Sequence, residues 1–276
     1  MIISEIEKLK EILLKLGSVL VAYSGGLDST LLLRVAKDVL GPESAAIIAS
    51  GPLFQQWETE AAEARARNLG VRYRLVPFDM LEHPEFQANS PDRCYHCKRL
   101  MYGEFLKAAN VWNLAYVVDG AQASDLEDDR PGQRASRELD VRSPMKEAGL
   151  SKKQIASASK ALGLDTWDKP SEACLATRIP FGMPVRPSAI ARIARCEALL
   201  HAFGIRQARV RYHHNDMARI EISPRDFDRI LDQRVRTRLL GEFKSTGFRR
   251  VSLDLEGYRS GSMKQVPDTR CRTTHE

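Results

Sequence analysis

One short segment of the chain combines glycine, serine and aspartate in an order suited to binding phosphate. It reads SGGLDS, and the candidate binding residues are Ser24, Gly25, Gly26, Asp28 and Ser29. The two glycines let the backbone approach an anion closely because they carry no Cβ. A helix that begins after them presents unpaired N–H groups and the positive end of its dipole. The segment therefore predicts a phosphate-binding loop.

Cysteines form a second group of residues that could do chemistry. Cys94 and Cys97 make a CxxC pair in PDRCYHCKRLMY, which we interpret as a polar loop, and Cys174 lies in EACLATR. A CxxC pair alone is ambiguous among zinc binding, disulfide exchange and iron–sulfur ligation. If Cys174 folds back to the pair, three thiols leave one iron of a four-iron cluster open. The alternative is that these cysteines are small buried residues, as we expect for Cys196.

The elements around the glycine segment must position these groups. Residues 19–23 (VLVAY) read as a buried strand, and strands are also predicted within 45–50, 71–79 and 113–122. They alternate with helical patterns, which is typical of an open parallel α/β sheet. Ligands of such sheets bind beyond the carboxyl ends of the strands. Polar residues lie at those predicted ends: Ser24, Ser50, Asp79 and Asp119.

A second, smaller domain is predicted after a proline-rich segment. Residues 169–187 read as a cysteine-bearing interdomain loop, which follows a helix over 150–164 with Ser151 as its N-cap. The pattern over 188–263 predicts the order αββαβ: a helix over 188–203, a strand pair around residues 214–216, a helix over 224–240 and a strand over 248–256. Residues 264–276, with Cys271, read as a frayed tail.

Composition restricts the class of protein. The 276 residues are 43% hydrophobic and 28% charged, as in ordinary globular proteins, and we expect no membrane segment. The amino-terminal segment is interrupted by Glu and Lys throughout, so it is no signal peptide and the cytoplasm is the expected location. Five cysteines argue against a disulfide framework. Residues 178–250 contain 16 lysines and arginines against 7 aspartates and glutamates, which favours phosphorylated ligands, nucleic acid or acidic subunits.

The phosphate-binding segment resembles the SGGxDS signature of the pyrophosphatase-loop (PP-loop) family, whose members split ATP between the alpha and beta phosphates and adenylylate a substrate. It is not a GxxxxGK[ST] loop, because no lysine follows the glycines. Six segments in order resemble the LarE family of ATP-dependent sacrificial sulfur transferases: SGGLDS, PDRCYHCKRLMY, DGAQASDLEDDRPG, KPSEACLATRIPFG, RVRYHHNDMARIEI and LDLEGYRSGSM. The resemblance covers Val19 to Met263. It implies an adenine nucleotide alpha hydrolase-like PP-loop domain over 1–168 and an α+β domain over 188–263.

The resemblance also implies a reaction. LarE proteins adenylylate a carboxylate of pyridinium-3,5-biscarboxylic acid mononucleotide and replace the activated oxygen with sulfur, towards the nickel-pincer cofactor of lactate racemase. ATP would bind at the SGGLDS segment, with Mg²⁺ held with help from Asp28. Arg209 and Arg211 alternate on one strand and so share a face, as a phosphate clamp requires, and the family pattern adds Glu221. The residues expected to act on sulfur or on the activated acyl group are Cys94, Cys97, Cys174, Lys98 and Arg178.

Alternatives remain at this point. Single-cysteine LarE proteins surrender their own sulfur, whereas three cysteines resemble the branch with a [4Fe-4S] cluster that carries an extra sulfide. The four arginine and lysine side chains could instead be solvated surface charges. A tRNA thiolase using ATP and a three-cysteine cluster is the runner-up function, and a redox or zinc-binding module is a third. Resemblance further implies a homo-oligomer, a hexamer, acting beside other proteins of nickel-pincer biosynthesis; the sulfur donor is not indicated.

Overall fold

A computed structural model of the protein describes residues 2–124, 131–259 and 261–263, so Cys271 and the predicted tail lie outside the described residues. The chain divides into two compact units. Unit 1 comprises residues 1–176 and 181–191, and unit 2 comprises residues 177–180 and 192–276. Within the described ranges, no helix has both the length and the apolar character needed to cross a membrane.

Unit 1 is built on a four-stranded parallel sheet, which confirms the predicted α/β class. Its strands lie in the order β3-β2-β1-β4, so the order reverses at β1. The strands are β1 (Val19–Ala22), β2 (Ser44–Ser50), β3 (Arg72–Pro77) and β4 (Tyr116–Val118). The crevice outside the carboxyl ends of the strands at such a reversal is where open α/β sheets bind ligands. The phosphate-binding segment follows β1 at that point.

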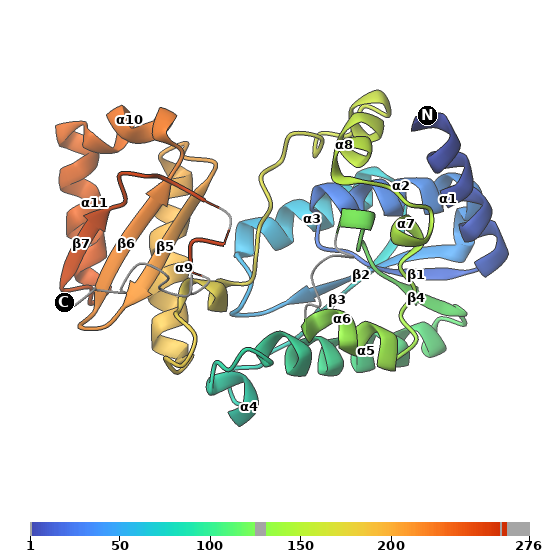
Figure 1. The fold of residues 1–276 in the computed structure, drawn as a ribbon, viewed down its shortest axis with the longest axis horizontal. Coiled ribbons are helices and arrows are strands. Elements are labelled where there is room, and N and C mark those ends of the chain that lie inside the picture. Colours follow the sequence, from blue (N-terminus) through green and yellow to red (C-terminus); the bar gives the residue numbers. More distant parts are fainter. Residues whose placement is uncertain (1, 125–130, 260, 264–276) are drawn as a thin grey trace, which may run out of the picture. The chain divides into compact units, whose positions relative to one another are not determined.

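Helices cover both faces of this sheet (Figure 1). One face is covered by α1 (Ile2–Leu16), α2 (Leu27–Leu40), α3 (Gln56–Asn68), α7 (Pro144–Glu147) and α8 (Lys152–Ala161), and the other by α5 (Arg93–Val111) with α6 (Pro131–Glu138) beside it. The short helix α4 (Pro84–Gln87) precedes α5. The predicted N-cap of α8 is confirmed, because Ser151 and Gln154 form a capping box.

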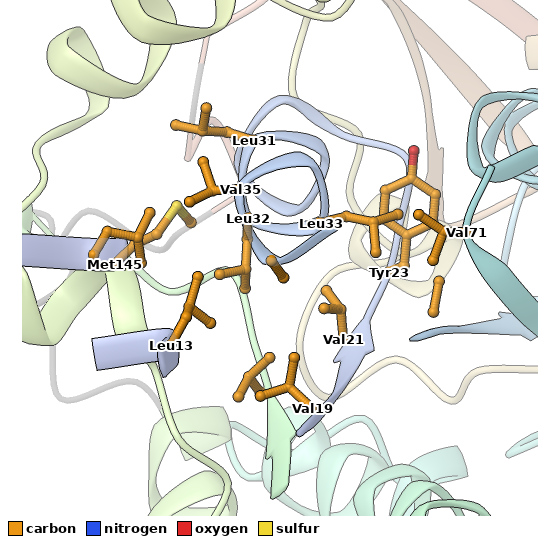
Figure 2. Packing of buried hydrophobic residues seen from close by; sticks show 14 of the residues in the cluster. Leu13, Val19, Val21, Tyr23, Leu31, Leu32, Leu33, Val35, Val71 and Met145 are labelled. Atoms are coloured by element: carbon orange, nitrogen blue, oxygen red, sulfur yellow. The ribbon is translucent and has the colours of Figure 1, made fainter. Parts of the chain in front are cut away.

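Alternation along β1 explains how one short strand serves two cores. Val19 and Val21 face the layer that contains α2, whereas Leu20 packs with Tyr102 and Phe105 of α5. All three strand side chains are fully buried. Figure 2 shows the core on the α2 side of the sheet, where the apolar side chains of α2 pack against β1, α1 and α7. This packing fixes the direction of α2, and with it the position of the segment from which α2 begins.

Unit 2 contains a three-stranded mixed sheet in the order β5-β6-β7. Its strands are β5 (Ala208–His213), β6 (Met217–Ile222) and β7 (Arg250–Leu253), and α9 (Pro187–Ala202) precedes them. The predicted hairpin at residues 214–216 is confirmed, with Asn215 and Asp216 at positive φ. Phe243 and Phe248 are buried, and their ring centroids lie 6.0 Å apart.

The single helix predicted over 224–240 is wrong. A 3₁₀ turn (Pro224–Asp226) and α10 (Phe227–Leu231) are followed by a break, after which α11 runs over Gln233–Ser245. Asp232 causes the break: its backbone is extended, and its carboxylate accepts the N–H groups of Arg234 and Val235 at 2.9 and 3.1 Å. A side-chain N-cap of this kind begins a new helix rather than continuing an old one.

Candidate functional site

The SGGLDS segment forms a tight loop between β1 and α2. The hydroxyl oxygens of Ser24 and Ser29 lie 3.1 Å apart, the Ser24 N–H donates to Ser29 Oγ at 3.3 Å, and the Ser29 hydroxyl donates to the Gly26 carbonyl. Because α2 begins at Leu27, its first N–H groups have no partners within the helix. The loop therefore presents backbone donors and two hydroxyls at the positive end of a helix, an arrangement that binds anions.

Glycines fit this loop tightly against its neighbours. Gly25 has a φ of +69°, and a Cβ added there would lie 2.6 Å from Cβ of Ala62 on α3. A Cβ on Gly120, which follows β4, would lie 3.2 Å from the backbone nitrogen of Ser29. The loop thus packs against α3 at Gly25 and against the segment after β4 at Gly120, with no room for a Cβ at the first contact and little at the second.

Asp28 points its carboxylate at a lysine. Lys152 Nζ, at the start of α8, lies 2.8 and 2.5 Å from the two carboxylate oxygens of Asp28. The Asp28 side chain remains 28% exposed. A carboxylate in this position is of the type that binds Mg²⁺, but the cation would replace an ion pair with Lys152 rather than meet a free acid.

Lys169 belongs to this loop, although the sequence analysis missed it. Its Nζ donates to the Gly25 carbonyl at 3.0 Å and also contacts the carboxylate of Glu58 on α3. The Lys169 and Glu58 side chains are only 12% and 11% exposed. No lysine follows the glycines of the loop itself. The lysine that contacts the loop lies 144 positions after Gly25. The sequence offers one signal for Lys169: it is the lysine with which the proline-rich KPSEAC segment begins.

The CxxC pair lies on a helix, not in the polar loop that we predicted. Cys94 and Cys97 occupy the first turns of α5, which begins at Arg93 directly after Pro91 and Asp92. Residues three apart on a helix share a face. Cys94 is exposed, whereas Cys97 and Cys174 are partly buried.

The pKa of the Cys97 thiol depends on its burial and on the charges around it. Burial raises the pKa of the Cys97 thiol far above its ordinary value, and the negative charges that Cys174 and Cys94 would carry raise it further. Arg93 and Lys98 act in the opposite direction on this pKa. Charges on Cys94 and Cys174 thus act on the Cys97 thiol.

The raised pKa of Cys97 predicts slow alkylation near neutral pH. Only the thiolate reacts appreciably, and a raised pKa keeps Cys97 protonated until the solution is strongly alkaline. We expect iodoacetamide to label exposed Cys94 well before Cys97, as measured by peptide mass spectrometry across the neutral to alkaline range. Equal labelling rates for both cysteines near neutral pH would contradict the burial of Cys97.

The segment that carries Cys174 is fixed at several points of unit 1. Lys169 contacts the phosphate-binding loop, the Leu175 N–H donates to the Leu53 carbonyl after β2 at 3.0 Å, and the Ala176 carbonyl accepts from Arg93 of α5 at 3.0 Å. Leu53 and Ala176 are fully buried. The segment therefore lies along the carboxyl edge of the sheet.

Lys98 and Arg178 occupy different surroundings. Lys98 Nζ lies 5.5 Å from the centroid of the Tyr102 ring, next to the cysteine pair on α5. Arg178 is fully buried in unit 2, where its Nε and Nη2 donate to the two carboxylate oxygens of Glu197 at 2.8 and 2.9 Å. The alternative of a solvated surface charge is therefore wrong for Arg178, and Glu197 is a buried partner that the sequence analysis missed.

The predicted phosphate clamp also lies within unit 2. Arg209 and Arg211 are 2% and 5% exposed, so neither is a solvated surface charge. Arg211 Nε and Nη2 donate to Glu221 at 2.9 and 2.8 Å, and Arg209 lies 5.1 Å from the centroid of the Tyr258 ring. The structure thus brings Arg211 and Glu221 into contact as an ion pair, with Arg209 two residues away on the same strand.

The polar residues at the other strand ends have structural partners. Asp119 is 5% exposed and accepts from Tyr102 Oη at 2.9 Å and from Ser143 Oγ at 2.7 Å. Asp79 accepts the Leu81 N–H at 2.8 Å. Both carboxylates therefore hold the loops in which they lie.

The cysteines supply the right donor type for an iron–sulfur cluster, which is bound through thiolates. Across residues 2–124, 131–259 and 261–263, however, no three His, Cys, Asp or Glu side chains are grouped so that they could hold a metal ion. The fit to a cluster thus rests on the chemistry of the three thiols and not on a metal-binding grouping of their side chains. Because these thiols must lose protons to bind a metal, occupancy would rise with pH.

Comparison with known proteins found relatives that match nearly the whole chain, although no family model matches it. An uncharacterised protein of Synechocystis is 38% identical over 266 residues, 96% of this chain and 99% of the relative. Pyridinium-3,5-bisthiocarboxylic acid mononucleotide synthase of Lactiplantibacillus plantarum is 36% identical over 255 residues, 91% of this chain and 90% of the synthase. An uncharacterised protein of Methanocaldococcus jannaschii is 31% identical over 242 residues, 88% of this chain and 91% of the relative.

Proposed function

Because the chain belongs to the LarE family of sulfur transferases, we propose that it adenylylates a carboxylate of pyridinium-3,5-biscarboxylic acid mononucleotide and replaces the activated oxygen with sulfur. This is the sulfur-insertion step in the biosynthesis of the nickel-pincer cofactor. One observation carries the proposal: the SGGLDS loop and the segment with Cys174 lie on the same carboxyl edge of the sheet. Activation by ATP and attack by sulfur can therefore occur in one place.

The loop residues would hold the phosphates of ATP. Backbone N–H groups at the start of α2 and the hydroxyls of Ser24 and Ser29 would contact the departing pyrophosphate. Mg²⁺ would offset its charge, with Asp28 exchanging Lys152 for the cation. The substrate carboxylate attacks the alpha phosphorus, pyrophosphate leaves, and the acyl carbon gains AMP as its leaving group.

Sulfur then replaces AMP at the acyl carbon. Cys94, Cys97 and Cys174 would bind a [4Fe-4S] cluster, which would supply a sulfide for transfer. Lys98 and Arg93 place positive charge near Cys97, which acts against the effect of burial on the pKa of that thiol. Without a cluster, the sulfur would come from Cys174 itself, whose Cβ–S bond would have to break to release the product.

Arg209, Arg211 and Glu221 would bind the phosphate of the substrate mononucleotide. Arg211 already donates to Glu221, so that its guanidinium is oriented before a ligand arrives. Ser262 Oγ accepts from Arg211 and donates to Glu221. These bonds further restrict the orientation of the Arg211 and Glu221 side chains. A buried, oriented guanidinium suits bidentate recognition of phosphate.

The proposal is tested with protein purified without oxygen, supplied with ATP, Mg²⁺ and the pyridinium dicarboxylate. We expect substrate-dependent AMP and a product in which sulfur replaces one carboxylate oxygen. About four irons and acid-labile sulfide per chain would support the cluster as the sulfur source. Protein without iron that loses one sulfur from Cys174 would instead support the sacrificial route. The absence of substrate-dependent AMP would contradict the proposed function.

Replacement of Lys169 should weaken the ATP step. Lys169→Met removes a charged donor from the Gly25 carbonyl, and such bonds contribute enough to change binding by about 10- to 100-fold. We expect an increase of this size in KM for ATP, measured by pyrophosphate release. Lys160→Met is the matched control, because Lys160 is exposed and contacts the Trp167 ring.

A double variant separates two causes of that loss. Lys169→Met leaves the carboxylate of Glu58 buried without its lysine, which could distort α3. Adding Glu58→Gln removes the uncompensated charge. If the double variant regains the KM of the native protein, the lysine only neutralises Glu58, and its role in the ATP site is refuted.

A further inference from the structure

The two segments that carry the cysteines are joined by one buried arginine. Arg93 is the first residue of α5 and directly precedes Cys94, and its side chain is 3% exposed. Its Nη1 donates to the Ala176 carbonyl at 3.0 Å, two residues beyond Cys174. The same Nη1 contacts Oδ1 of Asn89, one turn earlier. Arg93 thus connects the start of the CxxC helix to the segment with the third thiol.

Asn89 extends this connection along the chain. It is fully buried with a φ of +53°, its Nδ2 donates to the Met183 carbonyl at 2.8 Å, and its carbonyl accepts the Gly182 N–H at 3.1 Å. The Phe181 ring covers the Arg93 guanidinium, with its centroid 5.4 Å from Cζ. We call Asn89 and Arg93 with these contacts the Asn89–Arg93 clasp. It fixes the chain on both sides of residues 177–180.

The charge of Arg93 is unusual for a residue so deeply buried. Among the described residues, no carboxylate lies within ion-pair distance of its guanidinium, and its acceptors are a carbonyl and an amide oxygen. A buried cation without a counter-charge is costly. The groups that meet this charge are the Ala176 carbonyl, the Asn89 amide oxygen and the face of the Phe181 ring.

We propose that Arg93 is a positioning residue of the three-cysteine site: its bond to the Ala176 carbonyl holds Cys174 against the first turn of α5. The inference deepens the proposed function and rests on it for the chemistry of the three thiols. The geometry of the clasp can nevertheless be tested without any sulfur transfer. Neither the CxxC spacing nor the PP-loop signature points to this arginine.

Thiol cross-linking measures the effect directly. A short bifunctional thiol reagent is added to the full-length protein under mildly alkaline conditions, and the yield of Cys94–Cys174 peptides is measured by mass spectrometry. In Arg93→Met we expect this yield to fall by about tenfold, the effect of losing one charged hydrogen bond. Arg93→Lys keeps the charge but loses the guanidinium fork, so that it should restore the yield only partly.

A matched control excludes a general effect of losing an arginine. Arg72 also stacks on an aromatic ring, Trp112, at 4.4 Å, but it begins β3 at the amino end of the sheet. Arg72→Met should leave the cross-linking yield at the native level. A similar fall in both variants would overturn the role of Arg93.

Hydrogen exchange distinguishes local release from general unfolding. The N–H groups of Leu175, Gly182 and Val185 bond to residues outside their own segment. Arg93→Met should speed their exchange while the amides of β1 and β2 stay protected. Native cross-linking and native exchange in this variant would overturn the proposal.

Two further outcomes are decided by the same data. If Arg93→Met does not fold, a native yield in Arg93→Lys overturns the need for the guanidinium, whereas a reduced yield supports it. If the native protein cross-links but makes no thiocarboxylate product, the proposed function fails while the role of Arg93 is still decided.

Discussion

Cys174→Ala is expected to lower the rate of sulfur transfer by about 1,000-fold or more, because removal of a reacting nucleophile has effects of this size. Both sulfur sources require this residue, either as a thiolate that would bind the cluster or as the sulfur itself. Substrate-dependent release of pyrophosphate should persist, since the ATP loop contacts this segment through Lys169 rather than through the thiol. Product mass and pyrophosphate are measured in parallel.

Cys196→Ala is the control for this variant. Cys196 is also a free cysteine, but it is 1% exposed and burial raises the pKa of its thiol to about 12. It lies on α9 in the core of unit 2 and should be dispensable for sulfur transfer. If Cys174→Ala forms the thiocarboxylate at the rate of Cys196→Ala, the cysteine site does not supply the sulfur.

Gly25→Ala is expected to abolish most ATP-dependent adenylylation. An alanine at φ +69° costs about 1–2 kcal/mol, and its Cβ would lie 2.6 Å from the Ala62 Cβ, overpacking that costs about 1–3 kcal/mol. Together these correspond to about a 100-fold loss of the binding conformation or more. The rate of AMP formation at limiting ATP measures the effect.

Two variants separate strain from collision. Gly17 also has a positive φ, +75°, but a Cβ added there meets nothing within 4 Å, so Gly17→Ala should keep native adenylylation. Gly25→Ala with Ala62→Gly removes the closest colliding atom and should regain part of the activity. A Gly25→Ala variant as active as Gly17→Ala would show that the loop does not need its contact with α3.

The local elements of the sheet could be predicted because their signals are local. β1 and β2 were placed within a residue of their bounds, since each is an apolar run ending in a polar residue. The helix break at Asp232 was missed because apolar spacing continues across it. The CxxC pair was assigned to a loop because its polar neighbours obscured the helix that begins at Arg93.

The candidate site was predictable where chemistry is carried by residue type, and less so where it depends on long-range contacts. The spacing of the serines, glycines and cysteines in the sequence is enough to indicate their roles. The roles of Lys169 and Arg93 are not indicated in this way, because each acts on a backbone carbonyl that lies far away in the sequence. Likewise, nothing local shows that Arg178 is buried against Glu197 rather than exposed. The roles of the individual site residues stay predictions until variants are measured.

The late position of Cys174 in the chain sets the order in which the protein completes its thiol site during translation. All four strands of the unit 1 sheet precede residue 120, and Cys97 precedes Cys174 by a long stretch of sequence. At about 5–20 residues per second, the ribosome adds Cys174 roughly 4–15 s after Cys97. Throughout that interval the nascent chain holds a CxxC pair and an arginine whose carbonyl acceptor has not yet been made. The Asn89–Arg93 clasp therefore forms late in folding. A nascent chain stalled between Cys97 and Cys174 would contain Cys94 and Cys97 but not Cys174.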